Sequence, residues 1–264
     1  MQGKTNKTLS ILLPLALAAC GGGGGDGNPA ADSKPQQQQP QQQQQQNKAE
    51  TPAPSQQPES KNERYTGLVG NNKGEVSATN SNSKYILNLG DEIHQLPRDP
   101  KGATQRGNIL SYGVTSVYTA PDGDSYKSFH VSSDHYSYSK FGFANPAKGI
   151  PGIFFHGVPV NVMPVSGKAT YNGDAIVSLN SNFDGVEAGT VQAVADFGAS
   201  KLDISLASAS LKSSISAKID GSEFKGNENG KFVTGRFYGP LAEELNGVYD
   251  EKEGSTVAVF GAKR

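Results

Sequence analysis

The stretch Gly167–Leu179, GKATYNGDAIVSL, decides the fold class of this chain. Its apolar side chains stand two residues apart at Ala169 and Tyr171, and again at Ala175 and Val177. Side chains two residues apart lie on one face of a β-strand, whereas a helix would repeat them every three or four residues. The stretch therefore predicts a strand with one buried face.

Similar short alternating runs follow toward the C-terminus, and none of them has a long helical period. Asn-Gly or Asp-Gly pairs at 172–173, 184–185, 220–221 and 229–230 predict tight turns, because these pairs tolerate positive φ. About eight antiparallel strands with short connections close most economically into an up-and-down barrel. The further predicted strands are Gly189–Phe197, Lys201–Ala207, Ser213–Ile219, Glu223–Gly226, Lys231–Tyr238, Leu245–Tyr249 and Ser255–Gly261.

Small side chains recur along these predicted strands and favour a narrow barrel interior that side chains fill. They are Ala193, Ala195, Ala207, Ala209 and Ala217.

Residues 64–162 are less regular and predict a smaller, loop-rich β domain packed beside the barrel of residues 163–264. Proline breaks this part into loops at 97, 100, 146, 151 and 159. The overall prediction is all-β, with an N-terminal handle and a C-terminal eight-stranded barrel. The strands expected in the handle are Lys84–Leu89, Ile109–Tyr118, Ser125–Val131 and Tyr136–Phe143.

The first residues predict a lipoprotein signal peptide at 1–19. Lys4 and Lys7 precede an apolar run, Leu9–Ala18, which is shorter than the ~20 residues needed to span a bilayer. The run ends in Leu-Ala-Ala-Cys, which matches a lipobox, and Cys20 is the one cysteine of the chain. We therefore expect Cys20 to carry the lipid and to face the outer membrane.

Residues 20–63 predict a disordered tether. Five consecutive glycines and a glutamine-rich tract leave almost no large apolar side chain, so the segment cannot bury enough surface to offset the entropy of ordering. The formal net charge of the chain is −1, which gives no reason to expect nucleic acid as a partner.

Two segments carry a family resemblance. Phe237–Gly247, FYGPLAEELNG, together with the terminal VFGAKR, resembles the closing segment of the β-barrel domain of transferrin-binding protein B, and Met163–Gly173 resembles its opening strand. Similar strands occur in factor H-binding protein and in hemophilin-type haem carriers. The chain has room for a single lobe. Within the first segment we expect Gly239-Pro240 to end a strand and 242–245 to form one helical turn.

The resemblance implies a handle-and-barrel lipoprotein exposed at the cell surface, with a host protein or haem as its ligand. Relatives of this kind bind transferrin, haemoglobin, haem or complement regulators, and those that capture iron sources work with an outer-membrane transporter. For this chain it implies iron or haem acquisition. The alternative is immune evasion through a complement regulator.

The stretch Phe129–Tyr138 is the candidate ligand site. If residues 132–134 turn the chain, His130 and His135 could meet at a hairpin tip, and imidazole is a good haem-iron ligand. Zinc or nickel with Asp134, or a purely protein-contacting surface, are the alternatives. No cofactor is required. The candidate aromatic anchors in the handle are Tyr112, Tyr118, Tyr126, Tyr136, Tyr138 and Phe154.

Motifs of catalysis are weak in this sequence. No G-x-S-x-G, H-E-x-x-H or phosphate-binding loop occurs, and a lone S-x-x-K at 81–84 lacks its companion motifs. We therefore predict a binding protein and no enzyme. His156, in an apolar run, is expected to be a buried and hydrogen-bonded core residue, and His94 an exposed loop residue.

Overall fold

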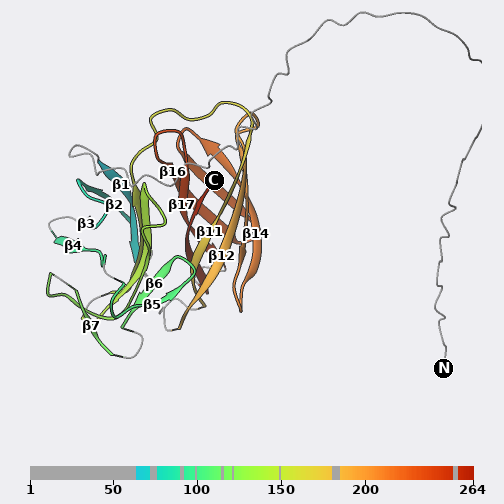
Figure 1. Ribbon diagram of the computed structural model, residues 1–264. Coiled ribbons are helices and arrows are strands. Elements are labelled where there is room, and N and C mark those ends of the chain that lie inside the picture. Colours follow the sequence, from blue (N-terminus) through green and yellow to red (C-terminus); the bar gives the residue numbers. More distant parts are fainter. Residues whose placement is uncertain are drawn as a thin grey trace, which may run out of the picture. The chain divides into compact units, whose positions relative to one another are not determined.

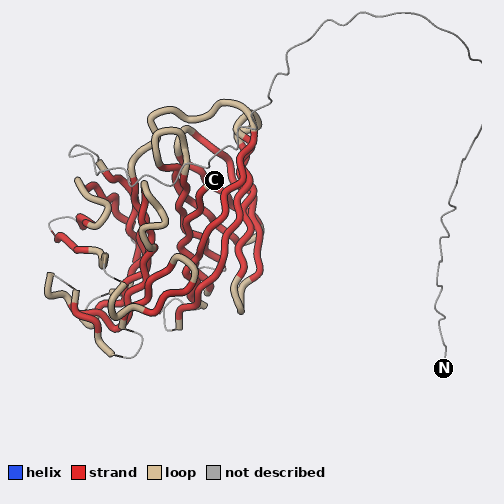
Figure 2. The backbone as a smooth tube through the Cα atoms, viewed as in Figure 1, coloured by secondary structure: helices blue, strands red, loops and turns tan. Residues whose placement is uncertain are grey.

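The computed structural model describes residues 64–264, apart from 72–75, 90–91, 99, 114–115, 121, 149, 180–184 and 252–254. The predicted signal peptide, Cys20 and the tether lie outside these residues. The described part is built of strands, turns and loops (Figure 2). Among its residues no helix is long and apolar enough to cross a membrane. The all-β prediction is confirmed.

The C-terminal strands close into the predicted antiparallel barrel, drawn from yellow to red in Figure 1. β11 pairs with both β12 and β18, so the sheet has no free edge. The barrel strands are β11 (Lys168–Ser178), β12 (Val186–Asp196), β13 (Lys201–Ala207), β14 (Lys212–Asp220), β15 (Glu223–Glu228), β16 (Lys231–Tyr238), β17 (Glu244–Glu251) and β18 (Thr256–Lys263).

The barrel interior is packed with side chains. Every second residue of β13 and β14 is buried and the others are exposed, as the alternation in the sequence predicts. Small residues such as Ala193 and Ala217 face rings such as Phe224, Phe237 and Phe260 across the interior. The interior of the barrel is therefore part of the hydrophobic core, and the surfaces available for binding are its outer wall and its two ends.

The handle is one twisted antiparallel sheet with a separate hairpin. The order of the main strands is β2-β1-β10-β9-β8-β6-β5, with β7 beside β8, and β3 pairs only with β4. The handle strands are β1 (Tyr65–Asn71), β2 (Val76–Ser81), β3 (Ile86–Leu89), β4 (Glu92–Gln95), β5 (Thr104–Arg106), β6 (Ile109–Tyr112), β7 (Tyr118–Thr119), β8 (Ser125–Ser132), β9 (Ser139–Pro146) and β10 (Gly152–Gly157).

The two faces of the handle sheet belong to different cores. Alternation along β10 sends Phe155 to a cluster shared with barrel residues such as Ile176 and Val259. The neighbouring Phe154 points the other way, into a cluster with Leu87 of the β3–β4 hairpin. The handle sheet is thus sandwiched between the barrel and an outer layer.

Several local predictions are wrong. Asn172-Gly173 lies inside β11 and makes no turn, because β12 and β18 pair with it on both sides. Residues 242–245 make no helical turn: a tight turn at 239–242 ends with Ala242 at positive φ, and β17 starts at Glu244. The predicted strands of the handle missed β1 and β10, which pair with each other.

Candidate functional site

A buried carboxylate joins the handle to the barrel. Glu244, at the start of β17, is 2% exposed and accepts hydrogen bonds from the backbone N–H of Ser137 (2.6 Å) and Tyr138 (3.2 Å) and from the Ser139 hydroxyl (2.7 Å). Burial raises the pKa of this carboxyl, and these donors oppose the shift. The segment 137–139 is therefore held against the barrel.

A second junction lies on β11. The Tyr136 hydroxyl donates to Asp174 Oδ2 over 2.7 Å, and to the Gly261 carbonyl over 3.0 Å. The Asn108 side chain donates to the same Asp174 oxygen over 2.9 Å. Tyr136, a predicted ligand contact, is therefore fully buried as part of the handle–barrel junction.

His130 lies in β8 with its side chain on the barrel-facing side of the handle sheet. It is 9% exposed, its Nδ1 lies 2.9 Å from the Ser111 hydroxyl, and its ring stacks on Phe143. Burial lowers the pKa of His130 to about 4. The imidazole is thus a neutral core group rather than an open ligand.

His135 has a different environment, so the structure does not pair the two imidazoles at a hairpin tip. It lies in the exposed turn between β8 and β9, edge-on to the ring of Tyr136. Burial lowers its pKa, and the Lys263 ammonium adds to that shift. Of the predicted ligand contacts in this stretch, His135 is exposed and Tyr138 is partly buried.

The other predicted aromatic anchors lie mostly in the core beneath the outer layer. Tyr112, Tyr126 and Phe154 are 2%, 4% and 2% exposed, and all three belong to one apolar cluster. Tyr118 is half-buried and packs 4.7 Å from the Tyr112 ring. These rings therefore lie beneath the exposed surface of the handle and are not themselves available to contact a partner.

The exposed surface above this cluster is the outer layer, which we define as β3, β4, residues 116–120 and residues 122–124. His94 pairs with Asp124 over 3.2 Å, and the Gln95 N–H donates to Asp122 over 2.8 Å, so the hairpin and the loop are tied together. Ile93 and Val117 project from it with exposed fractions of 65% and 59%. Sequence reasoning missed both residues, although an isolated Ile between acidic and polar residues on a short strand was a usable signal.

An ion pair at Asp134, whose side chain is 55% exposed, links Tyr85, the residue before β3, to the handle sheet. Asp134 Oδ1 accepts from the Tyr85 hydroxyl (2.7 Å) and from the buried Lys140 ammonium (2.9 Å). Burial alone would raise the pKa of Asp134, but Lys140 lowers it to about 2. His156, fully buried beside this group, bonds the Lys84 carbonyl through Nε2 as the sequence predicted, and burial lowers its pKa to about 4.

Comparison with known proteins identifies the barrel. Residues 163–264 match the family described as the C-lobe and N-lobe beta barrels of Tf-binding protein B. Residues 163–264 form a transferrin-binding protein B-type barrel. In this barrel the Phe237–Gly247 segment supplies the turn at 239–242 and the buried Glu244, so its role is architectural.

Solved structures of transferrin-binding protein B share the fold of handle and barrel. A mutant from Haemophilus parasuis Hp5 is 20% identical, with a TM-score of 0.54 over 75% of this chain and 44% of that protein. The isotype 1 protein from serogroup B Neisseria meningitidis is 17% identical, with a TM-score of 0.56 over 76% of this chain and 43% of that protein. This chain therefore spans less than half of their length.

A curated relative comes from Haemophilus influenzae. It bears the name uncharacterized protein and is 35% identical over 124 residues, which cover 42% of either chain.

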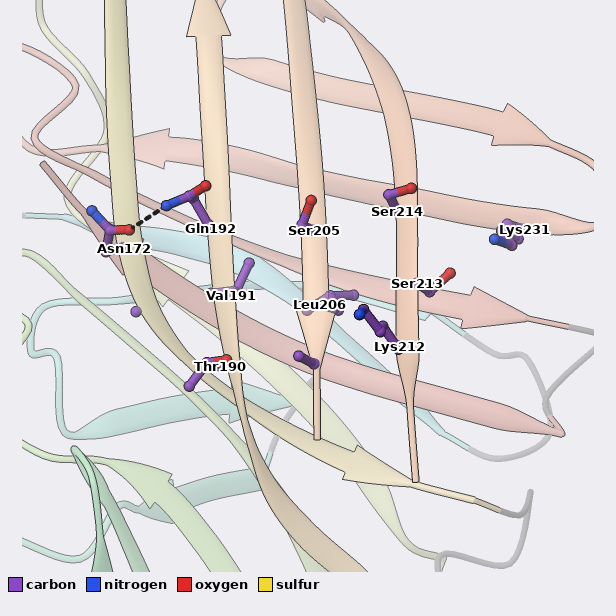
Figure 3. A pocket seen from close by; sticks show the side chains of 12 residues that line it. Asn172, Thr190, Val191, Gln192, Ser205, Leu206, Lys212, Ser213, Ser214 and Lys231 are labelled. Atoms are coloured by element: carbon purple, nitrogen blue, oxygen red, sulfur yellow. Dashed lines mark hydrogen bonds between the residues drawn. The ribbon is translucent and has the colours of Figure 1, made fainter. Parts of the chain in front are cut away.

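A shallow pocket lies on the transferrin-binding protein B-type barrel. Figure 3 shows Gln192, Ser205 and Ser214 on three neighbouring strands, with Lys212 close by. Its lining contains no histidine, cysteine or carboxylate, and the Ser213 hydroxyl is bound to Tyr249 over 2.8 Å. The lining residues are Asn172, Gly173, Thr190, Val191, Gln192, Ser205, Leu206, Ala207, Lys212, Ser213, Ser214 and Lys231.

Metal ligands do not cluster in the part of the chain that the structure describes. Within residues 64–264, outside the gaps, no group of three or more His, Cys, Asp or Glu is placed to hold a metal ion. The zinc or nickel alternative for His130, His135 and Asp134 therefore has no support in the geometry.

Proposed function

We propose that this chain is a lipid-anchored, surface-exposed outer-membrane protein that binds a host protein to acquire iron or haem. The observation that carries the proposal is the outer layer, a tied surface with exposed Ile93 and Val117 on the face of the handle that does not contact the barrel. The transferrin-binding protein B-type barrel supports it, because that barrel belongs to a family of binding proteins.

The site of binding is a surface rather than a cavity. The barrel interior is occupied by a cluster of its own apolar side chains, and the pocket on the barrel has no histidine or carboxylate in its lining. Ile93 and Val117 stand above a rigid cluster of rings, and apolar residues on a rigid support bind a protein partner without a large loss of entropy. On this proposal the chain is not an enzyme.

Haem enters the proposal as the cargo of a host protein. His130 is not open to haem iron, because its ring is buried and stacked on Phe143. His135 is the accessible histidine of the predicted stretch, and we propose it as the contact if haem binds directly. Cys20 carries the anchor, and an outer-membrane transporter is the proposed recipient of the iron source.

The test uses the chain from residue 20 with Cys20→Ser, immobilised on beads and exposed to transferrin, haemoglobin and a soluble complement regulator. We expect capture of one iron-bearing host protein, and a loss of about tenfold in affinity when Ile93→Ser and Val117→Ser are combined, which corresponds to ~1.4 kcal/mol. Val194→Ser, a partly exposed residue of the barrel wall, is the matched control and should bind normally.

Two outcomes would contradict the proposal. Capture of the complement regulator alone would assign the chain to immune evasion. Unchanged affinity in the Ile93/Val117 variant, with normal folding, would remove the outer layer as the site. A haemin titration of the same chain separates direct haem binding, since a red-shifted Soret band that His135→Ala abolishes would place haem on the chain itself.

A further inference from the structure

Three aliphatic side chains protrude from one end of the barrel. Val162, Val165 and Leu241 are 62%, 85% and 53% exposed, and we call them the tip. They come from the segment that enters β11 and from the turn that follows β16, so they lie at the same end of the barrel. The exposed apolar side chains named for the outer layer belong to the handle, so the tip is a separate surface.

The tip is built rigidly. The N–H groups of Asn161 and Val162 both donate to the Pro240 carbonyl, over 3.3 and 3.1 Å, and join the two segments. The Tyr171 hydroxyl donates to the Ala242 carbonyl over 2.7 Å, and the Arg264 guanidinium donates to the Leu241 carbonyl over 2.8 Å. These bonds hold the turn so that Leu241 points outward.

The same segment turns two of its apolar residues toward the barrel. Val160 and Met163 pack against the barrel core, whereas Val162 and Val165 point away from it. Burial of the first pair explains why the segment is apolar, but it does not explain the second pair. Residues 158–167 and 239–242 contain no charged side chain at all.

The chain from the N-terminus enters the handle beside the tip. Thr66 of β1 pairs with Gly157 of β10, and Pro159, two residues further on, pairs with Tyr238 at the end of β16. Arg64 therefore lies next to the segment that carries Val162. The 44 residues from Cys20 to residue 63 reach at most about 150 Å, and they join an anchor at Cys20 to the domain at this end.

We propose that the tip is a lipid-contacting surface that docks the barrel end on the membrane to which the chain is anchored. The proposal rests on the lipid attachment at Cys20 in the proposed function. Shallow insertion of aliphatic side chains is a usual mode of contact with a membrane surface, and the exposed Arg64 and Arg264 lie at the same end as Glu243, whose carboxylate accepts from the Leu241 N–H over 2.9 Å. A weak contact suffices, because the anchor makes docking an intramolecular event.

A second copy of the chain fits the tip less well. Stable interfaces bury about 20–30 residues on each side, and the tip consists of three exposed aliphatic side chains on two short segments. Host-protein binding measures separately whether the outer layer stays open to the solvent.

The test is flotation of the unlipidated chain, from residue 20 with Cys20→Ser, with vesicles of equimolar phosphatidylglycerol and phosphatidylcholine. We expect the chain to float with these vesicles, and the combined Val162→Ser, Val165→Ser and Leu241→Ser variant to partition about tenfold less. Phe232→Ser is the matched control: Phe232 is 44% exposed at the opposite end of β16, and its loss should leave flotation unchanged.

Three results would overturn the proposal: no flotation of the parental chain, equal flotation of the triple variant, or self-association of the parental chain that the triple variant abolishes. Matching thermal unfolding of all variants shows that each is folded. Labelling of Cys20 with palmitate in cells, and host-protein capture by the triple variant, test the anchor and the ligand site independently. Failure of the tip and failure of the proposed function are therefore distinguishable.

Discussion

At the scale of single residues, two buried histidines make the stability of the fold depend on pH. His130 and His156 are 9% and 0% exposed, and burial lowers the pKa of each to about 4. In the unfolded chain both would titrate near ~6.5. As pH falls below that value, the unfolded chain binds protons that the folded chain does not, so folding is disfavoured.

We expect the free energy of unfolding to fall as pH drops from about 6.5 to about 4, by up to ~2.7 kcal/mol per pH unit when both histidines contribute. His130→Gln combined with His156→Gln should flatten this dependence. The measurement is urea unfolding at a series of pH values, followed by circular dichroism. His135→Gln, in the exposed turn, is the control and should keep most of the slope.

Glu244 acts in the opposite sense, because burial raises its pKa and stability then falls as pH rises through that pKa. A double histidine variant with the parental slope would therefore contradict the prediction, since the remaining raised carboxyl cannot supply it. The environment of each histidine was only partly predictable from the sequence. His156 was identified as a core residue from its apolar neighbours, whereas His130 looked accessible because its neighbours in sequence are mixed.

At the scale of elements, the contact of β9 with the barrel depends on a missing side chain. Phe141 of β9 lies directly over Gly261 of β18, and a Cβ atom at position 261 would come within 2.3 Å of the Phe141 ring. It would also meet the Asn246 side chain at 2.6 Å. Glycine is therefore required here by close packing of two elements that are far apart in sequence.

Gly261→Ala should destabilise the protein by about 1–3 kcal/mol, because the ring and the strand must separate. We also expect faster hydrogen exchange along β9, where the handle meets the barrel. Gly198→Ala is the matched control, since its nearest atom would be 3.6 Å away and its substitution should change stability little. Equal effects of the two substitutions on unfolding would show that packing at the junction does not matter.

The sequence predicted strands well where one face is exposed. Lys201–Ala207 and Lys231–Tyr238 were placed to the residue, because their alternation is regular. The sequence did not predict β10, because Ile153–His156 shows no alternation of apolar and polar residues. The sheet is covered on both faces there, so each of these side chains is buried or nearly so. Its partner β1 was missed for a related reason, because pairing with β10 defines it.

At the scale of the whole molecule, handle and barrel share one core. Phe141, Phe143 and Phe155 of the handle pack with Ile176, Val257 and Val259 of the barrel. The hydrogen bonds of Glu244 and Asp174 cross the same junction. Separation of the handle from the barrel would expose apolar rings and leave a carboxylate without its hydrogen bonds.

We therefore expect residues 64–264 to unfold in one cooperative transition. Tyrosine fluorescence and far-ultraviolet circular dichroism should give the same midpoint in urea, and the sequence contains no tryptophan to complicate the signal. Two separated transitions would mean that handle and barrel are independent.

Periodicity and composition were sufficient to predict the local features of this chain. These are the all-β class, the eight barrel strands, the filled interior and the resemblance of residues 163–264 to a transferrin-binding protein B barrel. Each depends on side chains close together along the chain. Tertiary structure alone decided which aromatic residues are buried, because exposure depends on what covers a strand.

The outer layer covers Tyr112, Tyr126 and Phe154, and the barrel covers Tyr136, although the residues that do the covering are up to 125 positions away. The candidate contacts thereby moved from these rings to Ile93 and Val117. Alternation along a strand predicts which side chains share a face of the sheet. Which of the two faces is exposed to water depends on the packing of elements that are distant in the sequence.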